Sequence, residues 1–120
     1  MKKFAIGLTL SIGGFALAAS MLSAAPKVET ITGEIMDSQC AALGGHEKMI
    51  HEGQTEKECT NACVAIGGKY ALYDAANKKA YQLDNQKMPV KFAGQKVKVT
   101  GDVDEATKTI KVTTIVAAGK

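Results

Sequence analysis

Short stretches in which apolar and polar residues alternate recur along most of this chain, and they constrain its fold more than any other feature. Ile31, Gly33 and Ile35 alternate with polar neighbours, and Val97 and Val99 alternate with lysines. A period of two with many β-branched residues is typical of strands that turn one face toward a core. Strands are therefore expected over 29–37, 69–74, 80–83, 95–103 and 109–116.

The segment between the first two expected strands has a different character. Glycines and polar residues over 38–54 predict a loop with one helical turn near 47–51. Thr55 and Glu58 then form a T-x-x-E capping box, which satisfies exposed N–H groups at a helix start. A helix is expected over 56–66, ended by the glycine pair that follows.

Two of the expected strands carry irregularities. Gly101 lies in mid-strand and indicates a bulge or a sharp bend. Ile115 breaks the alternation of the last strand, which predicts a second irregularity near 113–114. The connector over 84–94 is expected to hold one helical turn at 90–92. Together these features predict a mainly β fold, a small five-stranded OB-like barrel with one helix inserted between strands 1 and 2.

The N-terminus has the pattern of a secretory signal peptide. Lys2 and Lys3 precede an apolar run over 4–19, which small residues follow. This run is too short for a resident membrane helix. We expect a signal peptide over 1–25, then a single OB-like domain over 26–120 with a helical insert at about 38–68. The protein is expected to be exported, periplasmic or extracellular, with no membrane attachment after cleavage.

The charge balance of the remaining chain argues against nucleic acid as a partner. Without Lys2 and Lys3, 13 lysines face 12 acidic residues, and the chain has no arginine. Nucleic-acid binders usually show a basic face with aromatic stacking residues. The aromatic residues beyond the expected signal peptide are only Tyr70, Tyr73, Tyr81 and Phe92.

The expected mature chain also resembles a group of small exported bacterial proteins that share a domain of unknown function. The matching residues are 32–40, His46, 59–64, 67–74 and 92–101. The C-terminal half is similar to exported bacterial barrels of the oligonucleotide/oligosaccharide-binding type. The resemblance implies export and this fold, and it implies no activity.

Three cysteines and a histidine gather in the middle of the chain: Cys40, His46, Cys59 and Cys63. Three thiolates and one imidazole form a closed tetrahedral set that suits zinc. Copper(I) also favours soft thiolate ligands. One hypothesis is therefore a zinc or copper site made of these four residues.

The other hypothesis is a disulfide with one thiol left over, which the oxidising environment of an exported protein permits. Cys59 and Cys63 are four residues apart on the expected helix, so their Cβ atoms would be roughly 5–6 Å apart. A disulfide needs about 3.8 Å between Cβ atoms. Cys40 would therefore pair with one of them, and the other would lie on an apolar helix face with Ala62 and Ile66.

These hypotheses give two functions. The first is a non-enzymatic exported binding or structural domain, stabilised by a Cys-linked insert, whose partner is an unidentified protein or cell-envelope component. The alternative is a periplasmic metal-binding protein that uses the Cys₃His set. An enzyme in which His46 activates a cysteine is not expected, because no acidic residue pairs with that histidine in the sequence.

Overall fold

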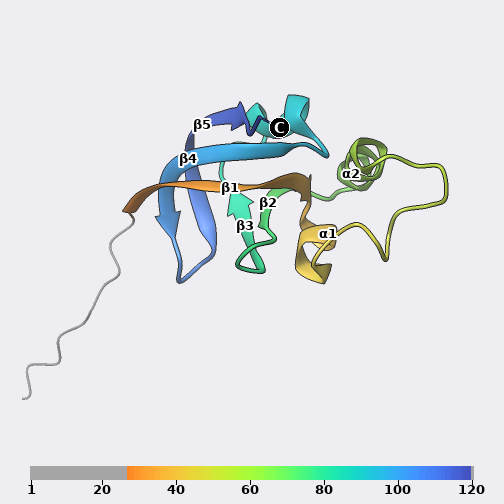
Figure 1. Ribbon diagram of the computed structural model, residues 1–120, viewed down its shortest axis with the longest axis horizontal. Helices are drawn as coiled ribbons and strands as arrows, with labels where there is room; N and C mark the ends of the chain where they lie inside the picture. The colour runs from red at the N-terminus through yellow and green to blue at the C-terminus, as the bar shows by residue number, and fades with distance from the viewer. Residues whose placement is uncertain (1–26, 120) are drawn as a thin grey trace, which may run out of the picture.

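The computed structural model describes residues 27–119 (Figure 1). Its elements are β1 (Lys27–Asp37), α1 (Ser38–Leu43), α2 (Glu56–Ala65), β2 (Tyr70–Asp74), β3 (Lys79–Leu83), the 3₁₀ helix η1 (Met88–Phe92), β4 (Lys96–Asp104) and β5 (Thr109–Ala117). The predicted signal peptide lies outside these residues. No helix within 27–119 is long and apolar enough to cross a membrane.

The strands close into a barrel in the order β1-β2-β3-β5-β4, and β4 pairs back onto β1. Neighbouring strands are antiparallel except β3 and β5, which are parallel. The prediction of a mainly β, five-stranded OB-like barrel is confirmed, as is a helix inserted between strands 1 and 2. The strand positions agree with the alternating segments to within two residues.

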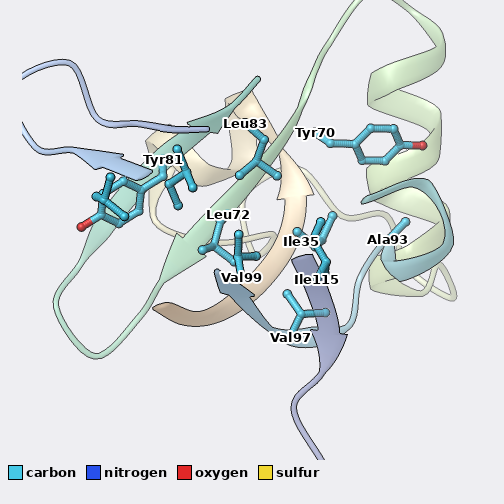
Figure 2. Packing of buried hydrophobic residues seen from close by; sticks show 11 residues of the cluster. Ile35, Tyr70, Leu72, Tyr81, Leu83, Ala93, Val97, Val99 and Ile115 are labelled. Carbon is cyan, nitrogen blue, oxygen red and sulfur yellow. The ribbon is translucent and has the colours of Figure 1, made fainter. Parts of the chain in front are cut away.

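Apolar residues fill the inside of the barrel (Figure 2). Ile35, Leu72, Val97, Val99 and Ile110 are fully buried. They come from four different strands, so the barrel cannot form from one hairpin alone. Their spacing by two along each strand is what places them on the inner face.

The pairing of β4 with β5 is irregular where the sequence predicted it. The register shifts between Thr100 and Gly101, and this shift leaves Thr113 as the extra residue of β5. A Cβ atom on Gly101 would collide with the carbonyl oxygen of Lys111. The two predicted irregularities therefore belong to one β-bulge, one on each of its paired strands. Only glycine fits at position 101 of this bulge.

The helical insert covers the outside of the barrel beside β1 and β2. Side chains alternate across β2, so Tyr70 and Leu72 enter the main core while Ala71 and Tyr73 face the insert. Met36 of β1 pairs across from Ala71 on this outer face and is 1% exposed. A second, smaller apolar cluster forms there, made of Met36, Cys40, Ala41, Cys59 and Ala71.

The first half of the insert differs from the prediction. The helix α1 occupies residues expected as loop. The helical turn expected near 47–51 is present as a single turn, in which the N–H of Ile50 donates to the carbonyl oxygen of His46 at 2.8 Å. Asp37 explains the difference, because its carboxylate accepts hydrogen bonds from the backbone N–H groups of Gln39 and Cys40. This cap starts a helix directly after β1.

The second helix begins where it was predicted, with the capping box of Thr55 and Glu58 in place. Its predicted apolar face is wrong in part, because Ala62 is exposed and Ile66 is 84% exposed. Cys59 is buried, and Cys63 is half-buried.

The rotation of α2 follows from its contacts with the barrel. The hydroxyl of Tyr70 donates a hydrogen bond to the side chain of Asn61 at 3.1 Å, and Val64 packs against the main core. Figure 2 shows Tyr70 reaching toward this helix. The stripe of Asn61 and Val64 therefore faces the barrel, and Cys59 belongs to the apolar cluster of the insert.

Candidate metal centre

The first sulfur of the site comes from α1. Cys40 lies one turn beyond the Asp37 cap and is fully buried. Because Asp37 is also fully buried and holds the backbone N–H of Cys40, the end of β1 determines where this thiol lies.

Two groups of potential ligand atoms meet at Cys40. Its Sγ, the Sγ of Cys59 and a ring nitrogen of His46 all lie within 4.8 Å of one another. In the second group, the Sγ atoms of Cys40 and Cys63 and a carboxylate oxygen of Asp37 lie within the same distance. The structure thus brings all four residues singled out in the sequence to one place, with Cys40 shared between the groups.

All three cysteines are free thiols. The expected disulfide between Cys40 and a cysteine of α2 is not formed, since no pair of sulfurs lies at bonding distance. The four-residue separation of Cys59 and Cys63 on a regular helix is consistent with this, because helix geometry keeps them from bonding each other.

His46 connects the thiols to the sheet. It is 6% exposed, and its Nε2 lies 2.9 Å from a carboxylate oxygen of Glu34 on β1. Its other ring nitrogen, Nδ1, is buried and has no hydrogen-bond partner. A buried ring nitrogen without a hydrogen-bond partner is unusual, because buried polar groups are nearly always hydrogen-bonded.

Glu34 is a site residue that the sequence pattern does not predict, because it is one of the polar residues that alternate with Ile31, Gly33 and Ile35. It shares its side of the strand with Met36, two residues on, and the insert covers both. The informative pattern was the apolar Met36 on an otherwise polar face, which indicates that something packs on the outside of the barrel there. Glu56, at the start of α2, also has a carboxylate oxygen within 4.8 Å of Glu34 and His46.

Burial dominates the electrostatics of the site. It raises the pKa of the Cys40 thiol well above its usual range, and the neighbouring Asp37 carboxylate adds to this. Burial also raises the pKa of Cys63. Both thiols therefore keep their protons at neutral pH in the metal-free protein, and a bound metal ion has to displace them.

The pKa of Glu34 is raised as well, first by burial and then by the nearby Glu56, while His46 acts in the opposite direction. The carboxylate therefore depends on the imidazole to offset part of the cost of its burial.

One side of the site opens to a hollow of about 260 Å³ between α2 and the loop that precedes it. The residues that line it are Met49, His51, Gln54, Cys59, Ala62, Cys63 and Ile66. The site is thus closed by the barrel on one side and accessible beside α2 on the other.

No protein-family model, no curated protein and no solved structure matches this chain. The resemblance to small exported bacterial proteins stays a prediction from the residues.

Proposed function

We propose that this protein binds a soft transition-metal ion, zinc or copper(I), through Cys40, Cys59, His46 and Cys63. The observation that carries the proposal is the state of His46. Its Nε2 lies 2.9 Å from Glu34, its Nδ1 is buried without a partner, and a ring nitrogen of His46 lies within 4.8 Å of the Sγ atoms of Cys40 and Cys59. A metal-binding histidine typically uses one nitrogen for the metal and donates the other N–H to a carboxylate.

The ligand spacing also supports a metal ion. Zinc–sulfur bonds of about 2.3 Å and zinc–nitrogen bonds of about 2.0–2.1 Å place tetrahedral ligand atoms less than 4 Å apart. The ligand atoms of Cys40, His46 and Cys59 are within 4.8 Å of one another. Small side-chain movements would bring these three to coordination distance. The Sγ of Cys63 lies within 4.8 Å of that of Cys40, and it would become the fourth ligand if its side chain moves toward His46 and Cys59.

The same residues also form a Cys–His–Glu arrangement, which resembles the nucleophile, base and orienting acid of thiol enzymes. The burial of the thiols argues against that function. A reactive cysteine has a lowered pKa and is partly exposed, whereas Cys40 is fully buried with a raised pKa. We therefore propose a non-enzymatic metal-binding protein.

Export remains part of the proposal. It rests on the signal-peptide pattern of residues 1–25, which lies outside the described residues, and on the near-neutral charge of the remaining chain. A protein with this site outside the cytoplasm would keep its thiols reduced by holding a metal ion on them, since free thiols there are exposed to oxidation.

The test is native mass spectrometry and competition titration with zinc and with copper(I), under anaerobic conditions. We expect one tightly bound ion per chain, held at this inner site of Cys40, His46, Cys59 and Cys63. Cys40→Ser should lower zinc affinity by more than about 100-fold, because even outer-shell partners of metal ligands are worth 10–100-fold.

Ala41→Ser is the matched control, since it places the same hydroxyl at the next buried position of α1 without removing a ligand. It should leave zinc affinity nearly unchanged. Equal losses in both variants, or a wild-type protein that takes up neither metal, would contradict the proposal.

A further inference from the structure

We propose that the hollow beside α2 is a second, outer position for a copper(I) ion, formed by Met49, His51 and Cys63, through which the ion enters and leaves the inner site. This inference rests on the proposed function. It names copper(I) as the metal ion and the hollow beside α2 as the path by which the ion reaches the inner site.

The hollow brings two soft ligands that are not part of the inner site, Met49 and His51, next to Cys63, which the two positions share. A thioether, an imidazole and a thiol, from Met49, His51 and Cys63, line the same 260 Å³ space, and Cys59 of the inner site lines it too. Met49 is 36% exposed and Cys63 is half-buried, whereas Cys40 and Cys59 are buried. Exposure of the sulfurs therefore decreases from the rim of the hollow to the inner site.

The loop between α1 and α2 holds the rim residues in place through two turns. The backbone N–H groups of Met49 and Ile50 both donate to the carbonyl oxygen of His46 at 2.8 Å, and Ile50 packs against the apolar cluster of the insert. The N–H of Gln54 donates to the carbonyl oxygen of His51 at 2.9 Å. Met49 is thus tied directly to the inner ligand His46.

The openness of the site argues against a purely structural zinc ion. Four protein ligands would close the inner site as in a structural zinc site. Two of them, Cys59 and Cys63, also line a solvent-accessible hollow with Met49 and His51, which gives an ion a path of exchange. Thioether sulfur at the rim selects copper(I), because methionine is a soft ligand and zinc is bound by thiolate, imidazole and carboxylate.

The exchange needs no change of oxidation state. Copper(I) binds first to the thioether of Met49, the imidazole of His51 and the sulfur of Cys63, whose thiol releases its proton to water. It then passes to Cys59 and Cys40, and each of these thiols releases one proton as its bond to copper forms. Release reverses these steps, with protons returning from water.

The test is NMR of the purified chain labelled with ¹³C at the methionine methyl groups, titrated anaerobically with copper(I) or with zinc. The Met49 resonance, assigned by its absence in Met49→Leu, should shift with copper(I) and not with zinc. The Met88 resonance should move with neither. Met49→Leu should slow copper(I) uptake from a competing chelator by about tenfold, which is the size of effect expected when a group around a metal ion is removed. Met88→Leu should leave the rate of uptake unchanged.

The outcomes separate this inference from the proposed function. If copper(I) binds while the Met49 resonance stays still and uptake is unchanged, the outer position is wrong and the inner site stands. If zinc binds and copper(I) does not, this inference fails alone. If neither metal binds, both fail.

Discussion

At the scale of single residues, His46 is the site residue whose position depends most on the rest of the fold. It follows α1 in a loop, yet it is 6% exposed because it lies between Glu34 of β1 and the thiols of α1 and α2. A lone histidine in a polar loop is ordinarily an exposed residue. Its burial here is the result of the insert folding back over the barrel.

Glu34 should act as a positioning residue for His46. Glu34→Ala removes the acceptor of Nε2, so the imidazole loses its fixed orientation, and metal affinity should fall by about 10–100-fold. Glu34→Gln keeps an acceptor oxygen and should recover part of that loss. Competition titration with zinc measures both effects.

Glu47→Gln serves as the control, since Glu47 is an exposed neighbour of His46. It should bind zinc as the wild type does. A Glu34→Ala protein with unchanged affinity would show that the 2.9 Å contact has no part in metal binding.

At the scale of elements, the docking of α2 on the barrel determines where two of the three sulfurs lie. Gly94, in the turn before β4, has a positive φ of 73° and its N–H donates to the carbonyl oxygen of Ile35 at 2.7 Å. A Cβ atom there would lie 2.5 Å from the backbone nitrogen of Lys57. The first turn of α2 therefore rests directly on this glycine.

Gly94→Ala should lower the free energy of unfolding by clearly more than about 1 kcal/mol, because it adds a clash with α2 to the cost of a non-glycine residue at positive φ. It should also weaken metal binding by shifting Cys59 and Cys63. Urea denaturation and zinc titration provide the two measurements.

Gly53→Ala is the matched control. Gly53 has a similar φ of 80°, but a Cβ atom there meets nothing within 4 Å. Gly53→Ala should lower the free energy of unfolding only by the cost of a non-glycine residue at positive φ. Equal losses of unfolding free energy in the two variants would mean that the packing of α2 on the barrel does not depend on Gly94.

At the scale of the whole molecule, the barrel core and the metal centre are separate. The main apolar cluster lies inside the barrel, whereas Cys40 and Cys59 belong to the smaller cluster under the insert. The barrel is therefore expected to fold without a metal ion, unlike small zinc domains that are unfolded when metal-free.

Removal of the metal with a chelator should leave the far-UV circular dichroism of the strands in place. The metal-loaded protein should be more stable by about 2.7 kcal/mol when free metal is at 100 times its Kd. Amide exchange should accelerate within 38–66 and not in the barrel strands. As a control, amide exchange in Cys40→Ser should not change when the chelator is added. Loss of the circular dichroism of the strands on chelation would contradict the separation of the barrel core from the metal centre.

The barrel could be predicted from the sequence because its determinants are local. Alternation by two, a capping box and a glycine in mid-strand each report on backbone geometry within a few residues, and strand positions, the start of α2 and the bulge at Gly101 all agree with them. The helix α1 was not predicted because its N-cap, Asp37, is also the last residue of β1.

The sequence by itself determined the closed β fold and identified the cysteines and the histidine as the chemically distinctive residues. Only the tertiary structure decided that Glu34 holds His46 and that the sulfurs are free thiols around one point, with Met49 and His51 at its opening. The physical reason is that strand and helix periodicities act between neighbours in the chain. The site depends on how far α2 rotates and on which outer face of the barrel the insert covers, and packing contacts between distant segments decide both.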